Sequence, residues 1–304
     1  MSTPAHKVPV TILVPVKNET ANLPRCLASV AWAGAVIVID SHSTDGTPEL
    51  ARRLGAQVVQ FDFNGTWPKK REWALRNLPF AHEWVFFLDA DEVLPPETEA
   101  EVRAIVENPK TTHAGYWINR RFMFLGQWLR HAYFPNWNLR LFRHKSAHYE
   151  KLAAEADTRS GDNEIHEHVI VAGTTGRLEC LMDHYAFPTI EAFVEKHNRY
   201  SNWEAAVALE ERPNGRSAEN LQHGNVTWRR RLKNLSRKLP FRPLQRFLYV
   251  YVWQLGFLDG RAGWYFARLH AFYEFLNVAK TYELRRARVT TVMHSVSMKD
   301  NGEI

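Results

Sequence analysis

The stretch VTILVPVKNETANLPRCLASV, from Val10 to Val30, decides the fold class of this chain. Its first part, VTILVPV, is mostly apolar and rich in β-branched side chains, which is typical of a buried strand. After a polar turn, Leu23, Leu27 and Val30 recur at helical spacing, which predicts a helix packed on that strand. A strand followed by a helix is the first half of a βαβ unit, whose next strand runs parallel to the first.

The same alternation continues to about residue 110. Further strands are expected at Ala35–Asp40, Gln57–Phe61 and Trp84–Leu88. One intervening helix is capped by Asp45 and ended by Gly55. Two more helices are expected from Pro68 to Leu78 and from Pro95-Pro96 to about Asn108. This order predicts an α/β fold, a Rossmann-like and mostly parallel sheet flanked by helices.

The remainder of the chain has a different pattern. The segments Gly115–Leu125 and Leu139–Arg143 are expected to be strands, helix dominates from Thr189, and the polar tail after Arg288 is expected to be loose. We therefore expect residues 1–110 and 111–188 to form two halves of one domain. Residues 189–304 would form a helical, basic extension that associates with a membrane.

Carboxylates follow the ends of the predicted strands, where ligands bind in open parallel sheets. Asp40 ends the second strand, and Asp89 and Asp91 end the fourth. The glycine-rich loops of dinucleotide-binding and P-loop proteins do not follow the first strand. A diphosphate would instead be held by Mg²⁺ or Mn²⁺, hard cations that suit the oxygen ligands of an Asp-Ala-Asp motif. The alternative is that Asp91 and Glu92 merely form an acidic cluster at a helix start.

Four motifs together resemble the donor half of the family 2 glycosyltransferases, which have a GT-A fold. They are VTILVPVKNETANLPRCLASV (10–30), VIVIDSHSTDGTPELA (36–51), WPKKREWAL (67–75) and WVFFLDADEVL (84–94). Four later stretches resemble more loosely the lipopolysaccharide core β-glucosyltransferase branch, the WaaE-like or KdtX-like enzymes. They are RLFRH (140–144), NEIHEHV (163–169), MDHYAF (182–187) and FLDGRAGWYFA (257–267), and with them the resemblance extends to about Lys280.

This resemblance implies that residues 1–110 bind the donor and that residues 111–188 bind the acceptor and carry the catalytic base. It also implies roles at matching positions. The residues that would line the nucleotide site are Pro15, Asn18 and Glu19, with Asp40 on the base and Lys70 near the phosphates. Asp89 and Asp91 would contact the ribose and the divalent cation. The second-strand motif of the family usually has two consecutive acids, whereas Ser41 follows Asp40 here, so the base and ribose contacts can differ.

An inverting transfer needs a carboxylate that deprotonates the acceptor hydroxyl. The best match to the family is Glu167, and Glu164 and Asp162 are the alternatives. His166 and His168 have the spacing of a zinc pair, but without a nearby cysteine this is the weaker interpretation. Arg140 and Arg143 are candidates for binding the departing diphosphate or an anionic acceptor, because arginine binds phosphate through two parallel hydrogen bonds. Ordinary strand-surface charge is the alternative for both arginines.

Charge is concentrated in one part of the chain. Between Asn220 and Leu258 there is no acidic residue but there are eight basic ones, more than the net charge of +6. Trp228, Leu232, Leu235 and Leu239 form an apolar stripe among them, which indicates a helix on an anionic membrane surface. The alternative is that the leucines pack on the catalytic domain and the charges are solvated. The apolar run Phe247–Leu258 is too short to span a bilayer, and is expected either to dip into the headgroup region or to be buried. Only two cysteines occur, which fits a reducing compartment.

The sequence therefore predicts an inverting, metal-dependent hexosyltransferase. The donor would be a nucleotide-sugar, expected to be a UDP-hexose, and the acceptor a lipopolysaccharide core or another lipid-linked surface glycan. The protein would work at the inner face of the cytoplasmic membrane. No nucleic-acid partner is expected, because the rest of the chain is near neutral and carries an acidic cleft at Asp89 and Asp91. The alternatives are a glycan-binding or membrane-scaffold protein without transferase activity, and a nucleotidyltransferase, which should carry a glycine-rich basic loop after the first strand.

Overall fold

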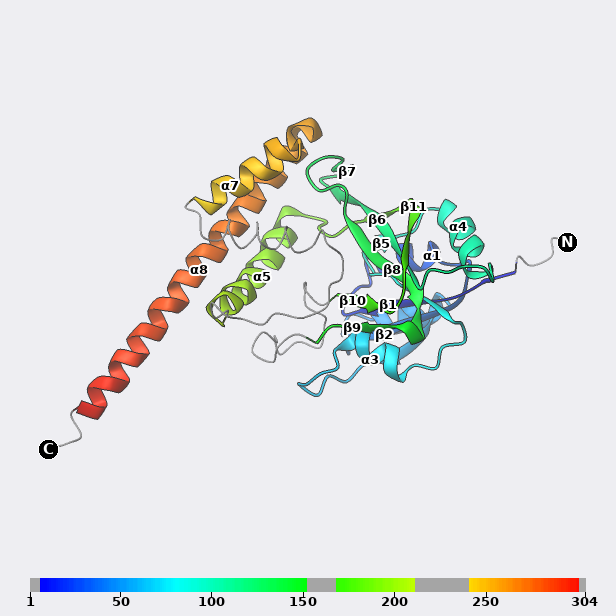
Figure 1. Ribbon diagram of the computed structural model, residues 1–304, viewed down its shortest axis with the longest axis horizontal. Coiled ribbons are helices and arrows are strands. Elements are labelled where there is room, and N and C mark those ends of the chain that lie inside the picture. Colours follow the sequence, from blue (N-terminus) through cyan, green and yellow to red (C-terminus); the bar gives the residue numbers. More distant parts are fainter. Residues whose placement is uncertain (1–5, 152–167, 211–240, 301–304) are drawn as a thin grey trace. The chain divides into compact units, whose positions relative to one another are not determined.

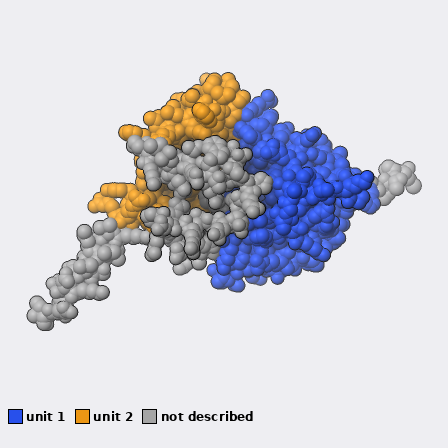
Figure 2. Space-filling view, in the orientation of Figure 1, with its two compact units in different colours: residues 1–130, 134–153, 157–186 blue, residues 131–133, 154–156, 187–304 orange. Residues whose placement is uncertain are grey.

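The computed structural model describes residues 6–151, 168–210 and 241–300 (Figure 1). The chain divides into two compact units, coloured blue and orange in Figure 2. Unit 1 comprises residues 1–130, 134–153 and 157–186, and unit 2 comprises residues 131–133, 154–156 and 187–304. Each unit is described by itself below.

The first unit is built on a nine-stranded mixed sheet in the order β3-β2-β1-β4-β8-β6-β11-β5, with β7 paired to β6. Its strands are β1 (Val8–Val16), β2 (Ala33–Asp40), β3 (Gln57–Gln60), β4 (Trp84–Phe87), β5 (Glu92–Val93), β6 (Gly115–Phe124), β7 (Gln127–Trp128), β8 (Trp137–Arg143) and β11 (Thr175–His184). The strands β1 to β4 pair in parallel, whereas β8 runs antiparallel to both of its neighbours. A separate antiparallel pair is formed by β9 (Ala147–Tyr149) and β10 (Val169–Val171), and the short turn η1 (His144–Ser146) precedes it.

Helices cover both faces of this sheet because its central strands are apolar on both sides. The helices are α1 (Leu23–Ala28), α2 (Thr47–Arg53), α3 (Lys70–Asn77) and α4 (Glu97–Val106). Along β1, Ile12 and Val14 face one hydrophobic cluster, which also contains Leu27 of α1 and Val102 of α4. The intervening Leu13 faces the second cluster, together with residues of α3, β9 and β10. The two-residue alternation of a strand thus creates one core on each side of the sheet.

The start and end of α2 show how the local sequence positions a loop of the site. Asp45 Oδ1 accepts hydrogen bonds from the backbone N–H of Thr47, at 3.0 Å, and from its hydroxyl, at 2.5 Å. Gly46 and Gly55 have φ values of 85° and 87°, a left-handed conformation that glycine adopts without a steric cost. The expected end at Gly55 is confirmed, since α2 ends at Arg53 and Gly55 follows its C-cap Leu54. The expected cap is wrong by one residue: Gly46 is the N-cap, and Asp45 binds Thr47 from the position before it.

The second unit is helical over its described part. Its elements are α5 (Ile190–Glu210), α7 (Arg242–Leu248), the π-helical turn η3 (Tyr249–Trp253), the 3₁₀ turn η4 (Gly256–Asp259) and α8 (Gly260–Asp300). The helix α8 packs against α5 and α7. No helix among the described residues is both long and apolar enough to cross a bilayer.

The observed fold is α/β with a mostly parallel sheet, helices on both faces and a long C-terminal helix, as the sequence predicts. The expectation of a loose tail after Arg288 is wrong, because α8 continues to Asp300. The predicted basic helix with Trp228 and Leu239 lies outside the described residues.

Candidate active site

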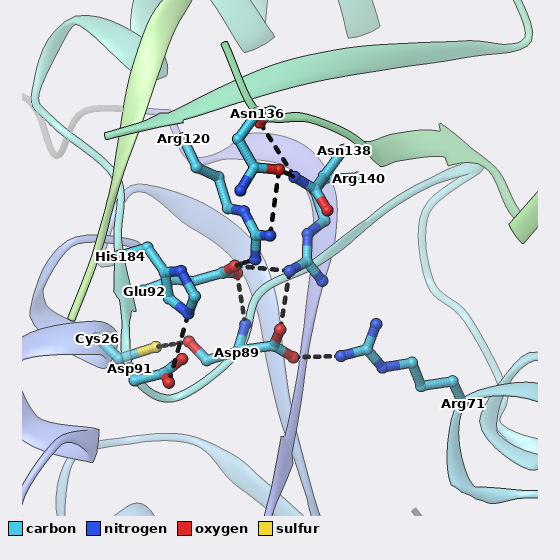
Figure 3. A network of polar contacts seen from close by, with 10 residues as sticks. All are labelled: Cys26, Arg71, Asp89, Asp91, Glu92, Arg120, Asn136, Asn138, Arg140 and His184. Atoms are coloured by element: carbon cyan, nitrogen blue, oxygen red, sulfur yellow. Dashed lines mark hydrogen bonds and ion pairs between the residues drawn. The ribbon is translucent and has the colours of Figure 1, made fainter. Parts of the chain in front are cut away.

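An acidic cluster forms where β4 ends. Asp89 and Asp91 lie in the turn between β4 and β5, at the carboxyl end of the parallel strands, and Glu92 begins β5 (Figure 3). Glu92 is completely buried and its Oε2 accepts the backbone N–H of Asp89 at 2.9 Å. This internal hydrogen bond closes the turn and fixes where the two aspartates project.

Three arginines neutralise this cluster. Arg140 Nη2 of β8 donates to Asp89 Oδ2 at 2.8 Å and to Glu92 Oε1 at 2.6 Å. Arg71 of α3 pairs with the other oxygen of Asp89, and Arg120 of β6 donates to Glu92 at 3.1 Å. Burial alone would raise the pKa of Asp89, but the guanidinium groups of Arg140 and Arg71 hold it well below its usual range. Asp89 is therefore a charged acceptor whose two oxygens are both engaged.

Asp91 has a different partner. Its Oδ2 lies 3.5 Å from Nε2 of His184, the last residue of β11. The pair is brought together by the antiparallel pairing of β11 with β5, in which His184 stands opposite Glu92. The backbone N–H of Tyr185 also donates to the carbonyl oxygen of Asp91 at 2.8 Å. Among the described residues, Nδ1 of His184 is buried without a hydrogen-bond partner.

A hydrogen-bonded loop follows β2, two strands away from β4 in the sheet. Asp40 is fully buried, and its Oδ2 accepts the backbone N–H of Ser43 at 3.0 Å. Asn18, which has a left-handed φ of 58°, accepts the N–H of Thr44 at 2.8 Å through its side-chain oxygen. The turn after β1 and the loop after β2 are thus bound to one another at the same edge of the sheet that carries Asp89 and Asp91.

The other expected nucleotide residues border these two loops. Pro15 is a half-buried residue of β1, and the N–H of Glu19 donates to the Thr47 hydroxyl at 2.8 Å. Lys70 is buried, and its Nζ donates to the carbonyl oxygen of Val16 at 3.0 Å. This contact anchors the first turn of α3 to the end of β1.

Two residues of the sequence prediction are not in this group. Arg143 is paired in register with Trp84, the first residue of β4, and forms an ion pair with Glu83. It therefore lies at the opposite end of β4 from Asp89. Glu167, with its alternatives Glu164 and Asp162 and the histidine His166, lies outside the described residues. Both cysteines are buried, and burial raises the pKa of the Cys180 thiol to about 12, which does not suit thiolate chemistry.

The sequence profile of Glycosyl transferase family 2 matches residues 11–163, about half of the chain. The match contains most of β1, all of β2 to β9 and the acidic cluster described above. The chain belongs to glycosyl transferase family 2. Among its relatives is the uncharacterized glycosyltransferase RP128 of Rickettsia prowazekii, 26% identical over 90% of this chain and 87% of that protein.

Two further proteins are similar to this family 2 glycosyltransferase. The lipopolysaccharide core biosynthesis glycosyltransferase LpsC of Rhizobium meliloti is 25% identical over 91% of this chain and 93% of that protein. A solved structure of glucosyl-3-phosphoglycerate synthase from Mycobacterium tuberculosis, in complex with Mn²⁺, UDP-glucose and phosphoglyceric acid, is 20% identical with a TM-score of 0.30. It covers 38% of this chain and 43% of its own.

The donor set of this glycosyltransferase fits a divalent cation held jointly with substrate phosphates. In the described part of the chain, no three acidic, histidine or cysteine side chains form a complete metal cluster. Asp91 and His184 offer one carboxylate and one imidazole at a spacing of 3.5 Å. Mg²⁺ usually takes one or two carboxylates and completes its shell with water and phosphate oxygens, and Mn²⁺ also accepts imidazole.

Sequence reasoning missed Arg71, Arg120, Glu92 and His184 as residues of this glycosyltransferase site. Arg71 and His184 lie inside the motifs WPKKREWAL and MDHYAF, but the resemblance of these motifs assigns neither side chain a role. The sequence signal for such site residues is a charged side chain that lies in one of these motifs and also follows or ends a buried strand. Their charged partners, however, lie 18 or more residues away, and only the packing of α3 and the pairing of the strands bring them together.

Proposed function

We propose that this chain is an inverting hexosyltransferase that moves a sugar from a nucleotide-sugar to a lipid-linked surface glycan. The observation that carries the proposal is the edge of the sheet where β1, β2 and β4 end, in a chain of glycosyl transferase family 2. Asp40 lies at the end of β2, and Asp89 and Asp91 follow β4. Ligands of open parallel sheets bind at this edge.

The donor nucleotide would lie across the two loops that are hydrogen-bonded to one another. Pro15, Asn18 and Glu19 line it, Asp40 contacts the base, and Lys70 faces the phosphates. Asp89 accepts a hydrogen bond from the ribose, because its carboxylate is charged and held in place by Arg71 and Arg140. A UDP-hexose is our proposed donor on the family resemblance.

Asp91 and His184 hold the divalent cation in this proposal. When bound, Mg²⁺ or Mn²⁺ offsets the negative charge that develops on the departing diphosphate. Arg71 and Arg140 are held beside the same site by their ion pairs with Asp89. Since Arg143 is directed to the other end of β4, the proposal assigns the diphosphate to Arg140 and not to Arg143.

Glu167 is the proposed general base. The acceptor hydroxyl attacks the anomeric carbon and forms the new glycosidic bond, while its proton passes to the Glu167 carboxylate. The bond between the anomeric carbon and the diphosphate oxygen breaks, and the nucleoside diphosphate leaves with the bonding electrons. Attack from the side opposite the leaving group inverts the configuration.

The acceptor class is proposed from relatives and charge. LpsC carries lipopolysaccharide core biosynthesis in its name and aligns with 91% of this chain. The basic stretch from Asn220 to Leu258 would hold the enzyme on the anionic inner face of the cytoplasmic membrane, where lipid-linked acceptors are elongated.

The test is release of nucleoside diphosphate from a panel of UDP-, GDP- and dTDP-sugars with Mn²⁺ or Mg²⁺, with and without a lipid acceptor extract. We expect slow hydrolysis of one donor, which Asp91→Asn lowers about a hundredfold, since a hard ligand of the cation is lost. Glu167→Gln should retain donor binding and lose transfer to the acceptor. Glu49→Gln is the matched control, because Glu49 is exposed on α2 and pairs with Arg52.

Each outcome decides one part of the proposal. An Asp91→Asn variant as active as Glu49→Gln would remove Asp91 from the cation site. If Glu167→Gln still transferred the sugar at the full rate, Glu164 or Asp162 would be the base instead. No binding and no turnover of any nucleotide-sugar would contradict the transferase function itself.

A further inference from the structure

The segment that ends α7 and leads to α8 exposes a run of large apolar side chains, which we call the apolar tip. Its members are the exposed side chains of Leu248, Tyr249, Val252, Trp253, Leu255, Phe257 and Leu258. Trp253 is 80% exposed, Leu258 56% and Val252 51%. Monomeric proteins rarely expose contiguous apolar patches of this kind unless the patch binds another surface. The tip is at the end of α8 opposite to the C-terminus, in orange in Figure 1.

The tip is supported from inside by packed aromatic rings. The ring of Tyr251 lies 5.2 Å from the rings of Phe247 and Trp264 and 6.2 Å from that of Phe257, measured between centroids. Gly256 packs so closely that an added Cβ would lie 2.6 Å from the carbonyl oxygen of Val250. The packed rings therefore fix the conformation of the turn. The same packing keeps the exposed side chains of the apolar tip in solvent.

The turn is also fixed by a buried acid. Asp259 Oδ2 accepts the backbone N–H groups of His131 and Ala132 at 3.0 and 2.8 Å, and its Oδ1 lies 3.0 Å from His131 Nδ1. Only 3% of its side chain is exposed. Asp259 is the only acidic residue from 241 to 273, so no exposed carboxylate accompanies the tip along this stretch.

Exposed charge next to the tip is cationic instead. Arg261 and Arg268 are exposed on the first turns of α8. Arg246 lies over the ring of Tyr249 at 5.8 Å, and Arg268 lies over that of Trp264 at 5.4 Å. Arg242 forms an ion pair with Glu274 on α8. An apolar, aromatic patch bordered by arginines is complementary to a surface with a hydrocarbon interior and anionic headgroups.

We propose that the apolar tip inserts into the headgroup region of an anionic bilayer and anchors the enzyme there. Trp and Tyr side chains favour this region, since their rings are apolar and their N–H or O–H groups can remain hydrated. The segment Leu248–Leu258 is much shorter than the roughly 20 residues of a spanning helix, so it lies in the interface. This inference rests on the proposed function, because an anchor on the bilayer serves an enzyme whose acceptor is lipid-linked.

A second copy of the chain fits this surface less well than a bilayer does. Two-fold self-association would place the same patch of each copy face to face. The arginines that border one tip would then meet those of the other, with no exposed carboxylate from 241–273 to neutralise them. Anionic lipid headgroups provide that neutralisation without a matching acid on the protein.

The experiment is co-sedimentation of the full chain with vesicles of phosphatidylcholine alone or mixed with phosphatidylglycerol. We expect the double variant Trp253→Glu/Leu258→Glu to bind the mixed vesicles about tenfold more weakly or worse, because two inserted apolar groups become charged. Trp253→Phe should retain most of the binding. Leu54→Glu is the matched control, because Leu54 is an equally apolar and 45% exposed residue at the end of α2.

High salt separates the tip from the basic segment that precedes it. At about 0.5 M NaCl exposed charges are screened within a few ångströms, whereas apolar insertion is not weakened. The unmodified chain should keep a measurable part of its vesicle binding in high salt, and the double variant should lose all of it. Binding of the double variant equal to that of Leu54→Glu would overturn the proposal, and so would complete loss of binding by the unmodified chain in high salt.

Two controls keep this inference distinct from the proposed function. Hydrolysis of the nucleotide-sugar donor in solution should be unchanged by Trp253→Glu/Leu258→Glu, because the tip has no part in donor chemistry. Vesicle binding without any donor turnover would contradict the transferase function and leave the anchor standing. A dimer measured by analytical ultracentrifugation that the double variant abolishes would assign the tip to a second copy and overturn the inference.

Discussion

Arg140 links the two carboxylates on which the acidic cluster depends, because one of its nitrogens donates to both Asp89 and Glu92. Glu92 is completely buried, and a buried charge is tolerated only where it is paired and hydrogen-bonded. The free-energy cost of separating Arg140 from these two carboxylates is therefore high. This residue-scale electrostatics, more than any local backbone feature, holds the β4–β5 turn in one conformation.

Replacing Arg140 tests this compensation. Arg140→Met should lower the free energy of unfolding by about 3 kcal/mol, since it leaves buried carboxylate charge without its main partner. The matched control is Arg143→Met on the same strand, whose partner Glu83 is 58% exposed, and it should cost less than about 1 kcal/mol. Urea unfolding measures both. Equal effects of the two variants on the free energy of unfolding would show that burial of the Arg140 ion pairs does not increase their contribution to stability.

His184 is the second residue-scale test. If Asp91 and His184 together hold the cation, His184→Ala should raise the Mn²⁺ concentration needed for half-maximal nucleotide release by about tenfold or more. A Mn²⁺ titration of donor hydrolysis measures this. His113→Ala is a suitable control, because His113 is a half-buried histidine of the same unit that bonds Thr174. An unchanged Mn²⁺ requirement in His184→Ala would leave Asp91 without its proposed co-ligand.

At the scale of elements, the packing of α5 against α8 depends on two uncharged histidines. The His197 ring stacks on Phe193 with centroids 3.7 Å apart, and lies 5.6 Å from the ring of His270. Burial lowers the pKa of His197 to about 4 and moves the pKa of His270 well below its usual value, with Arg246 acting in the same direction on both. The interface of these helices is therefore built for neutral imidazoles.

This packing predicts a loss of stability in acid. Between pH 6.5, where an unfolded histidine titrates, and about pH 4, the unfolded chain binds protons that the folded His197 does not. The free energy of unfolding should therefore fall with decreasing pH across this window, by about 3 kcal/mol from His197 alone. Urea unfolding at several pH values measures it. His197→Phe should flatten the profile, and a profile as steep as that of the unmodified chain would contradict the assignment.

At the scale of the whole molecule, the net charge of +6 is a property of one region. The basic stretch from Asn220 to Leu258 precedes α8, and the exposed arginines beside the apolar tip lie on the first turns of this helix. If these charges bring the enzyme to a membrane, their effect should depend on ionic strength, whereas the chemistry in unit 1 should not.

This difference can be measured on one preparation. Raising NaCl from about 0.05 to 0.5 M should lower transfer to a vesicle-embedded lipid acceptor several-fold, because association with the anionic surface is screened. Hydrolysis of the soluble nucleotide-sugar should change much less under the same conditions. Equal salt sensitivity of the two reactions would contradict a membrane role for the charge.

The central strands and the helices up to Val106 were predictable because their signals are local. The apolar runs that became β1, β2 and β4, and the turn residues Asp45 and Gly55, determine conformation through their own side chains. The antiparallel insertion of β8 between β4 and β6 was not predicted. It joins segments distant in sequence, and hydrophobic periodicity does not reveal which strand is the neighbour of which.

The sequence by itself determined that Asp40, Asp89 and Asp91 follow parallel strands and so share one edge of the sheet. Only the tertiary structure decided their partners. It brought His184 to Asp91 through the pairing of β11 with β5, and it placed Arg140 at Asp89 while Arg143 met Glu83 at the other end of β4. The physical reason is strand register. If one strand pairs with a different neighbour or in a different register, all contacts of its side chains change, and only the assembled sheet sets that register.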